Sequence, residues 1–98
     1  MRSKELLHSL KLSTFTAFDF ETTGLDPNSD RIIEIAAIRF EHGEIVDRFV
    51  TLVNPGIDIP NLITEITGIS NSMVYKSPKE AEIVDAFLSF LGDSPLVA

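Results

Sequence analysis

The sequence predicts an α/β fold in which an antiparallel three-stranded meander is followed by a helix that crosses the sheet and by the start of a fourth strand. Three β-prone runs at residues 13–21, 31–40 and 45–53 are joined by short connections, which favours neighbouring antiparallel strands. An amphipathic segment at residues 77–92 then carries apolar side chains at helical spacing. An apolar run at residues 95–98 begins another strand.

The bulk composition indicates one small, soluble domain. The chain has 98 residues, 44% of them hydrophobic, and no apolar run long enough to span a bilayer. We therefore expect a cytoplasmic protein that does not associate with membranes. A net charge of −7 argues against broad electrostatic attraction to nucleic acid, although bound cations and backbone N–H groups can still hold a strand end. Because the chain has no cysteine, a metal site must use oxygen or histidine ligands.

The first half of the chain supplies the meander, at residues 13–53. A leading helix or arm is expected within residues 1–12, where three leucines lie at helical spacing. Turn-forming residues fill the loop at 22–30 between the first two strands. The second strand is apolar on both faces, so we expect it at the centre of the sheet or covered on both sides. A tight turn at residues 41–44 joins it to the third strand.

The second half begins with a loop that contains short helices, at residues 54–76. Asn61 is a candidate N-cap for a helix that runs through Glu65 and stops at Gly68. Another helical turn is expected up to Tyr75.

The crossover helix at residues 77–92 has the clearest signals. Ser77-Pro78-Lys79-Glu80 is typical of a capping box with proline at the first helical position, and a glycine ends the segment. We expect an apolar stripe at i, i+3, i+4 and i+7 to face the sheet. The stripe consists of Val84, Phe87, Leu88 and Leu91, with Ile83 beside it.

Two acids in the first strand are the leading candidates for a functional site. The side-chain period of a strand is two, so Asp19 and Glu21 point to one face and Phe18 and Phe20 to the other. Charges are costly to bury without a partner, and a divalent cation between two carboxylates is a natural partner. The alternative is that the acids only mark the exit of the strand into solvent.

Four stretches of the chain together resemble the DnaQ-like (DEDD) 3′→5′ exonucleases, a family that includes the proofreading exonucleases of bacterial DNA polymerase III. They occur in the family's order and spacing and cover most of the chain from Phe15 onward. One Asp-x-Glu would be a weak signal, whereas the whole series is specific. The stretches are Asp19-Phe20-Glu21-Thr22-Thr23-Gly24-Leu25, Arg31-Ile32-Ile33-Glu34-Ile35-Ala36-Ala37-Ile38, Asn54-Pro55 and Ile66-Thr67-Gly68-Ile69.

The resemblance implies a ribonuclease-H-like fold, with an antiparallel meander followed by strands parallel to the first. The family's second motif, Ala-His-Asn, should begin at Ala98, where the sequence ends, and the third motif, with a general base and the last metal ligand, is absent. We therefore expect residues 1–98 to be the N-terminal part of a single exonuclease domain. By itself this chain is expected to hydrolyse nothing measurable.

The resemblance also implies roles for individual residues. Asp19 would bridge two Mg²⁺ or Mn²⁺ ions, and Glu21 would bind the first of them. The turn of Thr22, Thr23 and Gly24 would present backbone N–H groups to the terminal nucleotide, with the missing Cβ of the glycine permitting close approach. Side chains that would pack against the terminal bases are those of Leu25, Ile66 and Thr67. The alternative is that the two threonines are ordinary turn formers and that the apolar-wall candidates are core residues.

Glu34 is ambiguous between an acid beside the site and a structurally paired buried acid. We favour the structural role, because the family's metal ligands do not include a residue at this place.

The expected partners follow from the same resemblance. They are the 3′ end of single-stranded DNA, with RNA as the alternative substrate, and a replicative polymerase. A different class of function is a non-catalytic module that self-associates, because the first strand would be the uncovered edge of a three-stranded sheet.

Overall fold

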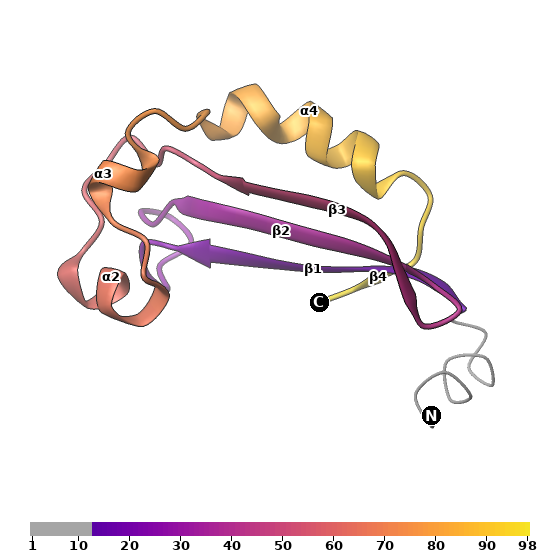
Figure 1. Ribbon diagram of the computed structural model, residues 1–98. Coiled ribbons are helices and arrows are strands. Elements are labelled where there is room, and N and C mark those ends of the chain that lie inside the picture. Colours follow the sequence, from indigo (N-terminus) through magenta and orange to yellow (C-terminus); the bar gives the residue numbers. More distant parts are fainter. Residues whose placement is uncertain (1–12) are drawn as a thin grey trace.

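The computed structural model describes residues 13–98, so the helix or arm predicted within residues 1–12 lies outside the described residues. It contains one four-stranded sheet in the order β3-β2-β1-β4, with α4 lying over one face and α2 and α3 at one end (Figure 1). The predicted meander, crossover helix and fourth strand are all present. The elements are β1 (Thr14–Thr22), β2 (Ile32–Glu41), β3 (Glu44–Leu52), α2 (Asn61–Thr67), α3 (Asn71–Val74), α4 (Glu80–Leu91) and β4 (Leu96–Val97).

The pairing of β1 with β2 contains one irregularity near the end of β1. The two strands are antiparallel, and the register shifts between the pairs Glu21↔Glu34 and Thr22↔Ile32. The shift leaves Ile33 as an extra residue in β2, which is a β-bulge. As a result Ile32 packs towards α4, whereas Ile33 is buried in a second cluster with Ile59, Ile69 and Val74.

A two-residue turn joins β2 to β3, as the sequence predicts. Glu41 pairs with Glu44 across the hairpin. His42 and Gly43 between them both have positive φ, at 53° and 81°. Two successive residues at positive φ are characteristic of the type I′ turn, whose twist matches that of the flanking strands. With β1 on its other side, β2 lies inside the sheet, as predicted.

The buried face of α4 differs from the predicted stripe by one residue. Ile83 and Phe87 are buried, whereas Val84 and Leu88 are 38% and 56% exposed. The cause is a set of aromatic contacts: the Phe87 ring lies 5.8 Å from Phe49 and 5.7 Å from Phe20, measured between centroids. Burying phenylalanine rings against the sheet removes more apolar surface from water than burying valine and leucine. The helix is rotated accordingly.

The start of α4 also differs from prediction, because the Ser77 capping box does not form. Lys79 occupies the N-cap position, and its N–H donates to Oε1 of Glu82 at 3.1 Å. Pro78 precedes the helix, since its carbonyl accepts a hydrogen bond from the N–H of Asn54 at 2.8 Å. A parallel bridge between Asn54 and Lys79 keeps this segment extended.

β4 partly covers the edge that β1 was expected to expose. Leu96 and Val97 pair in parallel with Thr16 and Ala17. The Thr16 N–H donates to the carbonyl of Pro95 at 2.8 Å. The expectation of a three-stranded sheet with an uncovered first strand is therefore wrong for this part of β1. Among the described residues, the parts of β1 before Thr16 and after Ala17 have no strand beside them on this edge.

The rotation of α4 leads to a stability prediction. We expect Phe87→Ala to lower the free energy of unfolding by roughly 3–5 kcal/mol, because it removes a buried ring and leaves a cavity. Leu88→Ala on the adjacent position is the matched control and should cost about 1 kcal/mol or less. Urea denaturation followed by circular dichroism measures both. Equal losses for the two variants would contradict the observed packing of α4.

Candidate functional site

The β1–β2 register places three acids on one face of the sheet. Glu21 lies directly opposite Glu34, and Asp19 lies opposite Ala36. Because side chains alternate along a strand and directly opposed residues share a face, both acids of β1 and Glu34 are on the same side. Asp19 is exposed, whereas Glu21 and Glu34 are half-buried.

These acids have no compensating charge nearby. Within residues 13–98, the one ion pair joins Arg39 to Asp47, and no hydrogen bond to the side-chain carboxylate of Asp19, Glu21 or Glu34 is present. The expectation that Glu34 is a paired structural acid is therefore wrong, and the residue lies beside the candidate site instead. Like charges directly opposed on a sheet are destabilising, and a bound cation would relieve that repulsion. Carboxylate oxygens are the ligands that Mg²⁺ and Mn²⁺ prefer.

The described residues do not complete a metal site by themselves. No group of three or more histidine or acidic side chains in residues 13–98 is arranged to hold a metal ion. Asp19 and Glu21 fit a hard divalent cation in chemistry and in shared orientation, but two carboxylates supply only part of the ligands that such an ion takes.

The loop after β1 is held by hydrogen bonds centred on Thr23. Its side chain is 2% exposed. Its hydroxyl donates to Oδ1 of Asp30 at 2.8 Å and accepts from the N–H of Arg31 at 2.9 Å. Its own N–H donates to the carbonyl of Arg31 at 2.8 Å. Both polar groups of Thr23 are engaged inside the loop, which leaves them unavailable to a substrate.

The loop also leaves two backbone N–H groups free to make contacts outside it. The Thr22 hydroxyl is not one of the free groups, because it donates to the carbonyl of Gly24 at 2.5 Å. The N–H groups of Gly24 and Leu25 make no hydrogen bond within residues 13–98. Further along, the N–H of Asn28 donates to the Asp26 carboxylate at 2.9 Å, which lowers the pKa of Asp26.

A cavity of about 600 Å³ lies between the end of β1, this loop and α2. Six of the eight residues singled out from the sequence line it, and the two that do not are Asp19 and Thr23. Three further residues line it that sequence reasoning did not assign to the site, namely Phe20, Leu62 and Ile63.

For two of these three additional cavity residues, a feature of the sequence or the sheet explains their position. Leu62 lies four residues before Ile66 in α2, so the two share one helical face, and both are largely exposed. Phe20 belongs to the opposite strand face from the acids, but it is still 37% exposed, because no strand pairs with β1 beyond Ala17 on that side in the described chain.

Local hydrogen bonds fix the end of α2 beside the cavity. The Thr67 hydroxyl donates to the carbonyl of Ile63 at 2.8 Å and accepts from the N–H of Ile69 at 3.1 Å. Gly68 follows the helix at φ 77°, and its N–H donates to the carbonyl of Thr64 at 2.8 Å. This left-handed cap ends the helix where the sequence predicts it. Thr67 therefore shapes the wall with a hydroxyl that is already engaged.

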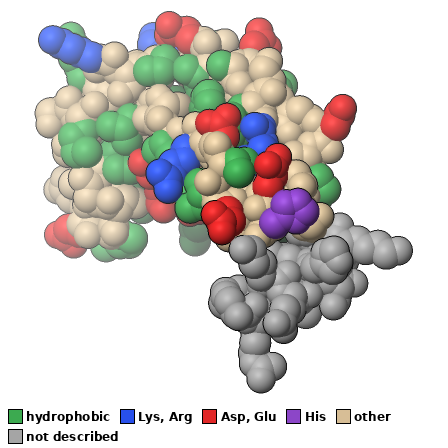
Figure 2. Space-filling model, turned by 45° about the vertical axis from the view of Figure 1, so that its right-hand side comes forward, with side chains coloured by type: hydrophobic (Ala, Val, Ile, Leu, Met, Phe, Trp, Pro, Cys, Tyr) green, Lys and Arg blue, Asp and Glu red, His purple; other side chains and the backbone are tan. Residues whose placement is uncertain are grey.

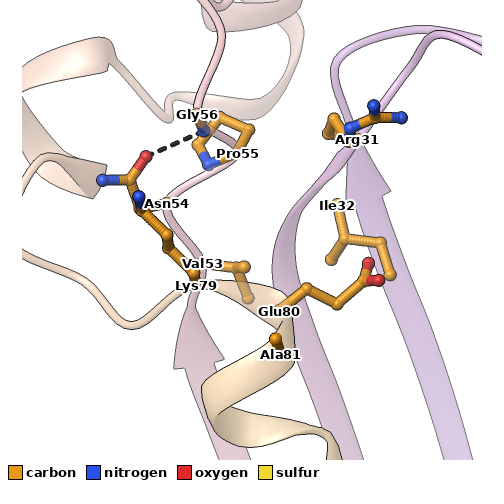
Figure 3. Close-up of a pocket in the computed structure, with 9 residues that line it drawn as sticks. All are labelled: Arg31, Ile32, Val53, Asn54, Pro55, Gly56, Lys79, Glu80 and Ala81. Atoms are coloured by element: carbon orange, nitrogen blue, oxygen red, sulfur yellow. Dashed lines mark hydrogen bonds between the residues drawn. The ribbon is translucent and has the colours of Figure 1, made fainter.

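A second cavity, of about 290 Å³, contains none of the predicted site residues. It lies between the start of β2, the end of β3 and the start of α4 (Figure 3). Arg31 and Lys79 contribute positive charge and Glu80 contributes negative charge. The Asn54 side chain at its rim is engaged with the backbone, because Oδ1 accepts from the N–H of Gly56 at 2.9 Å.

The face shown in Figure 2 carries no broad electrostatic signal for nucleic acid. On the face shown in Figure 2, acidic and basic side chains of the described residues are interspersed, without a continuous basic patch. Among residues 13–98, no helix combines the length and apolar character needed to cross a membrane.

Comparison with known proteins gives a consistent match. A family model described as Exonuclease matches residues 16–98. The DNA polymerase III PolC-type of Clostridium perfringens is 46% identical over 84 residues, which cover 86% of this chain and 6% of that protein. The DNA polymerase III subunit epsilon of Aquifex aeolicus is 40% identical over 96 residues, covering 98% of this chain and 48% of that subunit.

Solved structures show the same architecture. Exonuclease X in complex with 5′ overhanging duplex DNA superposes with a TM-score of 0.66 at 29% identity, over 74% of this chain and 42% of that one. Exonuclease I of E. coli in complex with a 5cy-dT13 oligonucleotide gives 0.71 at 26% identity, over 86% and 19%. The sheet and its helices therefore form the ribonuclease-H-like exonuclease fold. The chain spans less than half of the length of each of these four relatives.

The buried hydroxyl of Thr23 leads to a prediction about the loop. We expect Thr23→Val to lower the free energy of unfolding by about 1–3 kcal/mol, because the N–H of Arg31 and the Asp30 carboxylate each lose a partner. Thr23→Ser, which keeps the hydroxyl, is the control. Urea denaturation of the two variants measures the difference. A valine variant as stable as the serine variant would show that these hydrogen bonds do not support the loop.

Proposed function

The chain belongs to the exonuclease family, and we propose that the intact protein, meaning the full-length protein that contains this chain, is a metal-dependent 3′→5′ exonuclease that releases nucleotides from DNA ends. The cavity beside the end of β1 is the observation that carries the proposal. It brings a half-buried carboxylate, Glu21, next to a turn with free N–H groups and next to the apolar face of α2. A site that binds the end of a DNA strand and cleaves it with the help of metal ions requires three features. These are acidic groups for the metal ions, hydrogen-bond donors for the nucleotide and apolar walls for the base.

Asp19 and Glu21 are the residues that would hold divalent cations, Mg²⁺ or Mn²⁺, two of them in the complete site. Both carboxylates are on one sheet face and neither is engaged by a basic residue of the described chain. When bound, such ions activate a water molecule and stabilise the charge on the leaving oxygen. The protein's own task at this end of β1 is to keep two carboxylates in a fixed mutual orientation, which the β1–β2 pairing does.

The terminal nucleotide would be held by the turn and by α2. The N–H groups of Gly24 and Leu25 are free to donate to its sugar or phosphate oxygens. The side chains of Leu25, Leu62 and Ile66 are exposed and apolar, so they offer surfaces for the base. Contacts of this kind orient a strand end without depending on the identity of the base.

DNA is the proposed substrate, because the relatives are DNA polymerase III proteins and the two structural neighbours were solved in complex with DNA. A replicative polymerase is the proposed partner on the same grounds. RNA is the second candidate, since an exposed apolar cavity does not by itself exclude a 2′-hydroxyl. The alternative of a self-associating module has less support, because β4 occupies part of the β1 edge.

The acids of β1 give the first functional prediction. In the intact protein, Asp19→Asn and Glu21→Gln should each lower kcat/KM for single-stranded DNA by at least about 100-fold, because even groups that only support metal ligands are worth roughly 10–100-fold. Release of mononucleotides from a labelled oligonucleotide, with Mg²⁺, Mn²⁺ or EDTA, measures this loss.

The matched control for these variants is Asp58→Asn, an exposed loop acid that does not line the cavity beside the end of β1. A matched RNA oligonucleotide in the same assay decides between the two substrates. Activity that survives EDTA, or acid variants as active as the control, would contradict the metal-dependent mechanism.

A further prediction concerns the 98-residue chain by itself. We expect it to release no mononucleotides above background, because Asp19 and Glu21 alone supply too few ligands to hold and orient two cations. The purified chain is incubated with single-stranded DNA and Mn²⁺ beside the intact protein. Metal-dependent hydrolysis by the chain, lost on Asp19→Asn, would show that the described residues suffice.

A further inference from the structure

We infer that Asp30 is a positioning residue for the nucleotide-binding turn, and that position 24 is a glycine in order to make room for Asp30 rather than for the substrate. The inference rests on the proposed function, which assigns the turn to the terminal nucleotide. It concerns the contact between Gly24 and the Asp30 carboxylate, which does not line the cavity.

Gly24 has no conformational reason to be a glycine. It is not among the glycines with positive φ, so its backbone conformation is open to alanine. The obstacle is space. A Cβ built on Gly24 would lie 2.5 Å from Oδ2 of Asp30 and 2.8 Å from its Cγ. Real Cβ atoms essentially never approach so closely, so either the carboxylate or the turn would have to move.

The Asp30 carboxylate is not free to move, because both of its oxygens are engaged. Oδ1 accepts from the Thr23 hydroxyl and Oδ2 accepts from the N–H of Asp26, each at 2.8 Å. The N–H of Asp30 in turn donates to the Asp26 carbonyl at 2.8 Å. Hydrogen bonds to a carboxylate are among the stronger ones in proteins. The carboxylate therefore holds the residues on both sides of Gly24, and with them the segment that carries the free N–H groups of Gly24 and Leu25.

This arrangement separates two explanations of Gly24. If the glycine made room for the nucleotide, Gly24→Ala would damage binding whatever residue stands at position 30. If it makes room for Asp30, the damage depends on the volume of that side chain. Asp30→Ala removes the obstacle, whereas Asp30→Asn keeps it and changes only the charge and one acceptor. The cost of Gly24→Ala should therefore disappear in the first background and persist in the second.

The experiment measures kcat and KM of the intact protein on single-stranded DNA for the wild type, Gly24→Ala, Asp30→Ala, Asp30→Asn and both double variants. We expect Gly24→Ala and Asp30→Ala each to lower kcat/KM by about 10- to 100-fold, mainly through KM, because a misplaced turn misplaces the nucleotide. The Mn²⁺ concentration for half-maximal activity should not change, since the acids lie on β1 and not in the turn. Asp58→Ala is the control and should leave all values unchanged.

The double variants decide the inference. It is supported if adding Gly24→Ala to Asp30→Ala costs no more than about twofold, the margin within which independent sites add. It is overturned if the added cost exceeds that margin, or if Asp30→Ala also raises the Mn²⁺ requirement. Thermal unfolding of the same proteins gives a second double-mutant cycle, in which stability is measured instead of activity. A wild type without nuclease activity would refute the proposed function, while the unfolding cycle would still test the contact between Gly24 and Asp30.

Discussion

The antiparallel pairing of β1 with β2 is the constraint on which the rest of the structure depends. Its register sets Glu21 opposite Glu34 and places Asp19 on the same face. A slip by one residue would turn the acids towards α4 and bring the phenylalanines to the open face. The bulge at Ile33 adds a second consequence, because it directs Ile32 towards α4 and Ile33 towards the segment that carries α2. Both walls of the cavity are therefore placed by one strand pair.

The electrostatics of the candidate site follow from the same pairing. Acids gather on one face of a chain with a net charge of −7, and no basic residue of the described chain neutralises them. An anionic strand end has little to gain from such a surface in the absence of cations. Under the proposed function, bound cations make the local electrostatic potential positive, while N–H groups of the turn and apolar side chains of α2 hold the nucleotide. The acidic character of the chain is thus compatible with an enzyme that acts on DNA.

Residues of the loop show where reasoning from the sequence stops. Thr22, Thr23 and Gly24 form one motif, and the sequence assigns them one shared role. Their surroundings differ, because Thr23 is buried and bonded to Asp30 and Arg31, whereas the Gly24 N–H is free. Asp30 itself has no distinguishing pattern among the turn-forming residues of this loop. Its importance comes from contacts across six or seven positions of an irregular segment, for which no periodicity exists.

The sequence by itself determined the meander, the tight turn at His42 and Gly43, the shared orientation of Asp19 and Glu21 and the family, because strand alternation, turn chemistry and motif spacing are local properties. Only the tertiary structure decided which face of α4 is buried, where that helix begins, that Glu34 is unpaired and that Leu62 joins the cavity. These outcomes depend on competition between distant groups. Ile83 and Phe90 pack on the sheet in preference to Val84 and Leu88. The carbonyl of Pro78 accepts a hydrogen bond from the N–H of Asn54 instead of one within a helical turn. A pattern along the chain cannot rank such competitors, since their contact energies arise only when the chain has folded.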